Sequence, residues 1–345
     1  MDNAPWLATS ATGIGSLPGV DPVEAARIVV GELPELPHLP ELPARGVGAD
    51  LIGRTAGLLV DLAVEVAPSG YRVTAHRGRD HRRAVDLLRF DLDAFGEAVE
   101  RAGTGPGVVK VQLAGPWTLT AQLELARGHR VLTDSGALRE FTESLSEGLT
   151  AHVAEVAKRT GARVVVQLDE PVLPAVLTGL LPTPSKLGTV AAVPESEARE
   201  VLATVLDSAR TASGQPVIVH CCAKRPPFAL LRAAGADAVA FDLTVLWNAS
   251  TPVLDEIGEG WEAGMTLFLG LVPPTGSEPL PSVKDAARPA FELVDRLGFA
   301  RSLLADRAVP TPCCGLAGAS QGRVRGVLSL VRDLGRAFVE PPEGW

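Results

Sequence analysis

The sequence predicts an α/β fold, a single (β/α)8 barrel (TIM barrel) that spans residues 1–345. Three observations lead to this prediction. Eight short runs are mostly apolar on both faces, amphipathic stretches alternate with them, and polar or metal-binding residue types gather where the runs end. Strands buried on both faces and alternating with helices are typical of parallel sheets. A doubly wound parallel sheet has the same periodicity and remains the alternative.

Eight segments are candidate strands, and most of them combine β-branched residues with turn residues at their ends. In chain order they are Thr12–Ser16, Leu36–Leu42, Val108–Ala114, Arg163–Asp169, Pro216–Cys222, Ala238–Leu243, Thr266–Val272 and Ala308–Cys313. The second is poorly marked, since it lies in a proline-rich stretch.

Apolar residues at helical spacing predict the helices between these strands. They are Pro22–Glu32, Gly48–Val66, Ser135–Arg159, Glu195–Thr211, Ser282–Leu297 and Arg323–Phe338, with shorter ones at Pro227–Ala234 and Val253–Ala263. The stretch Gly70–Asp91 fits neither element and is expected to be an excursion between the second helix and the third strand. Its basic piece, His76–Arg83, is less favoured as a functional patch.

Composition excludes several classes of function. The chain has 345 residues, with 32 basic and 41 acidic side chains and a net charge of −9 at pH 7, which argues against nucleic acid or an anionic membrane as partner. No apolar run approaches the ~20 residues of a membrane helix. The first residues lack the pattern of a secretory signal. The expected location is therefore cytoplasmic.

The 4 cysteines form two adjacent doublets, Cys221-Cys222 and Cys313-Cys314. Neighbouring cysteines rarely satisfy disulfide geometry with each other, and a free cysteine is commonly a small buried apolar residue. Their position suggests another role, because both doublets lie at the C-terminal ends of predicted strands. In a barrel, the active site is built at these C-terminal strand ends.

His220 and Cys222 are two residues apart on the fifth predicted strand, so they share one face while Cys221 points the other way. Imidazole and thiolate are ligands that zinc prefers. With one cysteine of the second doublet, they form a plausible zinc site. A hydrogen-bonded core histidine is the alternative for His220.

Five segments resemble the C-terminal catalytic barrel of cobalamin-independent methionine synthase, in the same order. They are Ile14–Pro18, Leu113–Pro116, Gln167–Pro171, His220–Cys222 and Cys314–Leu316. The similarity covers residues 12–338. The wider superfamily includes uroporphyrinogen decarboxylase, which needs no metal. The histidine and cysteines resemble the zinc-dependent branch instead.

The resemblance implies zinc as cofactor, with His220, Cys222 and Cys314 as ligands and Asp242 in place of the family's glutamate. It also implies a homocysteine pocket. Ile14, Gly15 and Ser16 would bind the carboxylate of homocysteine and Asp169, as a catalytic and substrate-binding residue, its amino group. Glu41 is a candidate for a second carboxylate at the amine.

The sequence departs from the family pattern at the methyl donor. Gln122 stands near the family's folate-stacking tryptophan, for which Trp117 is a candidate substitute, and Ala175 stands near a pterin-binding carboxylate. The loop Val272–Gly276 has no counterpart of the family's catalytic histidine. Methylfolate and a methylcorrinoid therefore both remain possible donors.

The leading hypothesis is a zinc-dependent methyltransferase that acts on a thiol, with homocysteine as the expected acceptor. One alternative is a methylcorrinoid-dependent enzyme that acts on another thiol. The other is a non-catalytic zinc-binding paralogue, in which the metal only stabilises the barrel. An open amino-acid pocket beside the metal would favour an enzyme, because structural zinc sites are closed.

Overall fold

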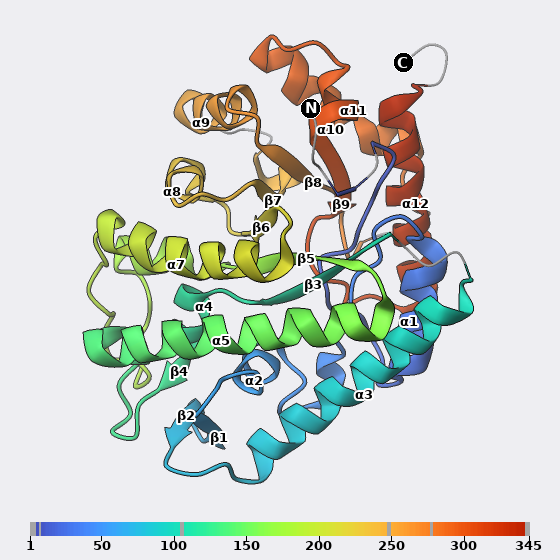
Figure 1. Ribbon diagram of the computed structural model, residues 1–345. Coiled ribbons are helices and arrows are strands. Elements are labelled where there is room, and N and C mark those ends of the chain that lie inside the picture. Colours follow the sequence, from blue (N-terminus) through green and yellow to red (C-terminus); the bar gives the residue numbers. More distant parts are fainter. Residues whose placement is uncertain (1–4, 7, 104–106, 247–249, 277–278, 342–345) are drawn as a thin grey trace.

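The central element is a curled sheet of six parallel strands (Figure 1). The computed structural model describes residues 5–6, 8–103, 107–246, 250–276 and 279–341. The strands, in the order in which they pair, are β3 (Val108–Ala114), β5 (Arg163–Asp169), β6 (Val217–His220), β7 (Ala238–Asp242), β8 (Thr266–Val272) and β9 (Ala308–Pro312). This confirms the α/β class and six of the eight predicted strands.

The first two predicted strands are extended segments that lie between β9 and β3. The Thr12 N–H donates to Pro310 O at 3.4 Å, and the Leu39 N–H donates to Lys110 O at 2.8 Å. The two segments bridge each other at Ser16 and Glu41. Their pairing is short because prolines in the second segment lack an N–H for a sheet hydrogen bond.

Eight helices surround the sheet (Figure 1), and each contacts the next in a closed ring. In ring order they are α1 (Pro22–Glu32), α3 (Arg79–Arg101), α5 (Ser135–Thr160), α7 (Glu195–Ser213), α8 (Phe228–Ala233), α9 (Thr251–Glu262), α10 (Val283–Leu297) and α12 (Gln321–Val339). A short helix, α11 (Leu303–Arg307), precedes β9. Within the described residues, no helix combines the length and apolar character needed to cross a bilayer.

The predicted helix Gly48–Val66 is wrong in its second half. The helix α2 covers only Leu51–Ala56 and is capped at Gly57, and Asp61 then adopts a left-handed conformation (φ 56°) in the connection to β1. After this connection, β1 (Ala63–Ala67) pairs antiparallel with β2 (Gly70–Thr74). The short β4 (Leu123–Glu124) adds to β2 and completes a small second sheet.

The expected excursion at Gly70–Asp91 is partly corrected by α3, which begins at Arg79 and belongs to the helix ring. Charged side chains fill its exposed face, whereas Leu88, Leu92 and Phe95 recur at helical spacing and are buried. The basic stretch His76–Arg83 is thus the connection after β2 and the first turn of α3, which is a structural helix.

The inward-facing side chains of the sheet divide into an apolar and a polar layer. The apolar layer consists of Leu36, Val108, Val165, Ile218, Ala238, Ala240, Phe268 and Val309. The Trp6 ring packs edge-to-face on Phe268 at 5.2 Å and covers this layer. Two residues further along β3 and β5, toward their C-terminal ends, lie the buried polar residues Lys110 and Gln167.

Glu170, directly after β5, has a structural role. Its carboxylate accepts hydrogen bonds from the backbone N–H groups of Trp117 and Thr118, at 2.9 and 2.7 Å, and from the Thr118 hydroxyl at 2.7 Å. These donors are at the start of α4 (Pro116–Gln122), where helical N–H groups lack backbone partners. Glu170 thus fixes the turn that follows β3.

We expect Gly148→Ala in α5 to destabilise the protein, because a Cβ there would come within 2.0 Å of Leu58 O. Such overpacking against backbone typically costs about 1–3 kcal/mol. Gly31→Ala in α1 is the matched control, because a Cβ there meets no atom within 4 Å. It should be neutral or stabilising by up to ~1 kcal/mol. Urea unfolding of both variants measures this, and equal effects would contradict the close approach.

Candidate functional site

Three of the four predicted metal ligands meet beyond the C-terminal ends of β5, β6 and β9. The ligand atoms of His220, Cys222 and Cys314 all lie within 4.8 Å of one another. His220 ends β6, Cys222 follows two residues later, and Cys314 follows β9. Cys221 and Cys313 are buried and are not part of this group. The second cysteine of each doublet thus belongs to this group, and the first does not.

Asp169 orients the His220 imidazole. The last residue of β5, Asp169, is paired with His220 in the parallel register, and its Oδ1 lies 2.7 Å from His220 Nδ1. His220 Nε2 is buried and has no hydrogen-bond partner among the described residues. A carboxylate on one ring nitrogen, with the other facing the ligand group, is the arrangement found around zinc-binding histidines.

A hydrogen bond joins the Cys222 and Cys314 side chains. The pKa of Cys314 is lowered mainly by a hydrogen bond from the Cys222 thiol. The nearby His220 and a hydrogen bond from the Gly315 N–H lower it further. The hydrogen bond between the two cysteines and burial raise the pKa of Cys222. Burial also raises the pKa of Cys221, to about 12. Two sulfurs and one imidazole with an unpartnered nitrogen fit a zinc ion and leave a fourth position for another ligand.

Asp242, the fourth expected ligand, lies outside this group. It ends β7, and its Oδ1 accepts hydrogen bonds from the Thr244 N–H at 2.9 Å and the Thr244 hydroxyl at 2.6 Å. The Asp242 carboxylate also contacts Cys313 rather than Cys314. Its short side chain is thus held by its own loop, away from the converging sulfurs.

All the residues expected to bind substrate line one cavity of about 240 Å³, which the three metal-type residues also border. The lining residues are Ile14, Gly15, Ser16, Glu41, Pro43, Leu51, Asp169, Pro171, His220, Cys222, Cys314 and Gly315. The space is polar at the strand ends and apolar at the prolines and Leu51. It can hold a small molecule with a sulfur at one end and charged groups at the other.

Glu41 presents a buried oxygen to this cavity. Its Oε1 has no hydrogen-bond partner among the described residues. Burial is the largest cause that raises the pKa of Glu41 to about 7, whereas Arg54 and Lys110 oppose this shift. A cationic ligand group would supply the missing partner and favour the carboxylate form.

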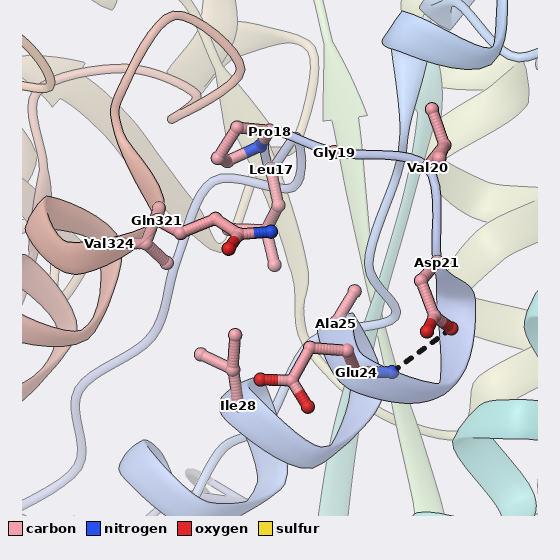
Figure 2. A pocket seen from close by; sticks show the side chains of 10 residues that line it. All are labelled: Leu17, Pro18, Gly19, Val20, Asp21, Glu24, Ala25, Ile28, Gln321 and Val324. Atoms are coloured by element: carbon pink, nitrogen blue, oxygen red, sulfur yellow. Dashed lines mark hydrogen bonds between the residues drawn. The ribbon is translucent and has the colours of Figure 1, made fainter.

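A second cavity, of about 170 Å³, lies between the beginnings of α1 and α12 (Figure 2). None of its ten lining residues is a cysteine or histidine. Its two carboxylates have structural partners, because Asp21 caps α1 and Glu24 pairs with Arg325 at 2.7 Å. This cavity is therefore separate from the chemistry of the cysteines.

Trp117 is not a substitute for the folate-stacking tryptophan, so that expectation is wrong. The side chain is fully buried, and its Nε1–H donates to Ala198 O in α7 at 2.9 Å. The ring therefore packs between α4 and α7. Gln122 ends α4, and Ala175 lies in α6 (Leu173–Thr178), so neither position carries an aromatic ring or a carboxylate.

The sequence analysis missed three buried polar residues below the site, Lys110, Gln112 and Gln167. They alternate with apolar residues on β3 and β5, so they share the inward face with Asp169. The signal was available, because a lysine and two glutamines inside otherwise apolar strands are unusual in a core.

We expect the metal-stripped protein to react with iodoacetamide first at Cys314. The thiolate is the reactive form, and the lowered pKa of Cys314 populates it below the ordinary thiol pKa of ~8.5. Mass spectrometry after brief labelling from pH 5 to 9 should show a midpoint for Cys314 below that value. The Cys313→Ser variant should label identically. Labelling of Cys314 only above pH 8.5 would contradict the lowered pKa of this thiol.

The fold and the sequence of this chain are similar to those of known proteins. The fold resembles a B12-independent methionine synthase from Shewanella sp. W3-18-1 in complex with selenomethionine, with a TM-score of 0.61, 14% identity, and coverage of 95% of this chain and 97% of that one. It also resembles a methyltransferase from Methanosarcina mazei, with a TM-score of 0.56, 17% identity, and coverage of 98% and 94%. No curated protein matches in sequence. The family profile "Cobalamin-independent synthase, Catalytic domain" matches residues 7–336. The chain therefore belongs to the family of cobalamin-independent synthase catalytic domains, which are methyltransferases.

Proposed function

We propose that this protein is a zinc-dependent methyltransferase that methylates the thiol of homocysteine to give methionine. One observation carries the proposal: His220, Cys222 and Cys314 border the same cavity as the carboxylates Glu41 and Asp169. A metal-type group and an amine-binding group in one small space match the two ends of an amino-acid thiol.

Each end of homocysteine has a residue to receive it. Ser16 and the backbone at Ile14 and Gly15 would bind the carboxylate, since a glycine lets a ligand approach the chain closely. Glu41 and Asp169 would bind the ammonium group, and the unpartnered Glu41 Oε1 supports this. Asp169 also holds the His220 ring.

His220, Cys222 and Cys314 would hold the zinc ion. Zinc would lower the pKa of the acceptor thiol, so that the acceptor reacts as a thiolate near neutral pH. The protein positions this sulfur by binding the two charged groups at the other end of the molecule. The sulfur then attacks the methyl carbon of the donor, the new S–C bond forms, and the electron pair of the broken bond leaves with the donor.

We also infer that the whole chain forms one (β/α)8 barrel domain. The closed ring of eight helices supports this, as do the hydrogen bonds that join segments 12–16 and 36–42 to the edge strands β9 and β3. In such a barrel the site lies at the C-terminal strand ends, where these ligands are found.

Zinc content tests the ligand set. The purified protein should hold about one zinc per chain, since the described residues contain one group of this kind. Cys222→Ser and Cys314→Ser should lose the metal, whereas the matched controls Cys221→Ser and Cys313→Ser should retain it. Equal loss from all four variants would refute the choice within the doublets, and loss from Asp242→Asn would return that residue to the ligand set.

The methyl donor is the second test, and we expect methylcobalamin to outperform methyltetrahydrofolate. The nitrogen that leaves from methylfolate needs a proton, and the loop after β8 carries no histidine at residues 272–276 to supply it. Loss of a general acid typically costs about 10²–10⁴-fold in rate. The cobalt of methylcobalamin leaves as a reduced centre and needs no proton.

The buried Trp117 removes a further contribution to methylfolate binding, since stacking on an aromatic ring contributes roughly 0.5–1.5 kcal/mol. Methionine formation from homocysteine should be compared with both donors on one zinc-loaded preparation. Equal or faster turnover with methylfolate would refute the donor assignment. Absence of turnover with any donor, despite zinc and thiol binding, would instead favour a non-catalytic paralogue.

A further inference from the structure

Lys110 is a buried lysine that the proposed reaction does not use. Its side chain is fully buried, and its Nζ lies 3.0 Å from Ile14 O, 2.7 Å from Gln167 Oε1 and 3.3 Å from Gln112 Oε1. An ammonium group has three N–H donors and no acceptor. All three neighbours are acceptors, so each glutamine turns its carbonyl oxygen toward Lys110 and its NH₂ group away.

The NH₂ group of Gln167 points to the metal-type site. It donates to Asp169 Oδ1 at 2.8 Å and to Ile14 O at 3.0 Å. Because Asp169 Oδ1 accepts this bond and also faces His220 Nδ1 at 2.7 Å, the imidazole proton is placed on Nδ1. The Nε2 lone pair is thereby left toward the cysteines.

The NH₂ group of Gln112 points to the other carboxylate of the cavity. It donates to Leu39 O at 2.6 Å and also hydrogen-bonds the Glu41 carboxylate. The Oε1 of Glu41 remains without a partner among the described residues. Lys110 is thus connected to both acidic groups of the cavity through one amide each.

The neighbouring segment leaves room for this arrangement. A Cβ at Gly15 would come within 2.9 Å of the Gln112 Cγ, so a side chain there would displace the amide. The absence of side chains at Gly15 therefore lets the long polar groups of β3 fill this part of the interior.

We propose that Lys110 is a positioning residue for amine recognition: through Gln112 and Gln167 it holds Glu41 and Asp169 as hydrogen-bond acceptors, so that the cavity selects thiols that carry a primary ammonium group. The inference rests on the proposed function and adds the residue that determines its selectivity. Lys110 itself does not touch the substrate. It acts by fixing the polarity of two amides that would otherwise be free to rotate by half a turn.

The test is the binding of two thiols to the zinc-loaded full chain by calorimetry. Homocysteine carries the amine, and 4-mercaptobutanoate is the same molecule without it. Lys110→Met preserves length and removes the donors. We expect its preference for homocysteine over 4-mercaptobutanoate to fall by roughly tenfold to a hundredfold relative to wild type, as on loss of hydrogen bonds to charged groups. Zinc stoichiometry and 4-mercaptobutanoate affinity should stay near the wild-type values.

Thr311→Val is the matched control, because Thr311 is a buried polar residue of β9 whose hydroxyl has no partner among the described residues. It should keep the wild-type preference. If Lys110→Met does not fold, Gln112→Met interrupts the connection to Glu41, together with the bond to Leu39 O, leaves Gln167 and Asp169 connected to Lys110, and should show the same selective loss. Histidine nitrogen shifts give a separate measurement, since Gln167→Met should disturb the His220 tautomer and Gln112→Met should not.

Equal weakening of both thiols in Lys110→Met would overturn the proposal, because a purely structural role predicts no selectivity. A wild-type protein that binds both thiols equally would also overturn it, while leaving the zinc–thiol assignment intact. A wild-type holoprotein that binds neither thiol would refute the proposed function itself, and this inference with it.

Discussion

The hydrogen bond between Asp169 and His220 is the interaction on which the arrangement of the site depends. It joins residues that are register partners at the ends of β5 and β6, so the sheet itself sets its length. The bond determines which imidazole nitrogen faces the two cysteines. A shift of one residue in either strand would turn one of the two side chains to the helix layer. The proposed metal site therefore depends on the register of β5 and β6.

A polar layer inside a sheet is costly unless its hydrogen bonds are made. Lys110, Gln112 and Gln167 satisfy one another and three backbone or carboxylate acceptors, so their desolvation is offset. His38 is the contrast, since it is buried in the same interior and its burial, together with the nearby Lys110, lowers its pKa. The apolar layer thus stabilises the interior of the sheet, whereas the polar layer orients the side chains that border the cavity.

The sequence was informative where a local pattern determines the structure. Alternation on a strand distinguishes Cys222 from Cys221, and the helix α1 has the predicted bounds, Pro22–Glu32. It was uninformative where the chain departs from such a pattern. The apolar run after Ala56 continues a helical pattern, yet α2 stops at Ala56 and the left-handed backbone at Asp61 lies in the connection to β1. The burial of Trp117 involves a contact with Ala198, which is 81 residues away and which no short-range pattern reveals.

The Trp6 ring and the apolar layer beneath the site have a kinetic consequence. They fill the end of the sheet interior opposite to the strand ends that carry the candidate ligands, so in the proposed reaction acceptor and donor would both enter at those strand ends. In that reaction the small acceptor would lie in the cavity, against the proposed metal ligands and the carboxylates. A bulky donor then covers it. In the proposed reaction binding is therefore ordered: the thiol enters first, the demethylated donor departs next, and the thioether leaves last.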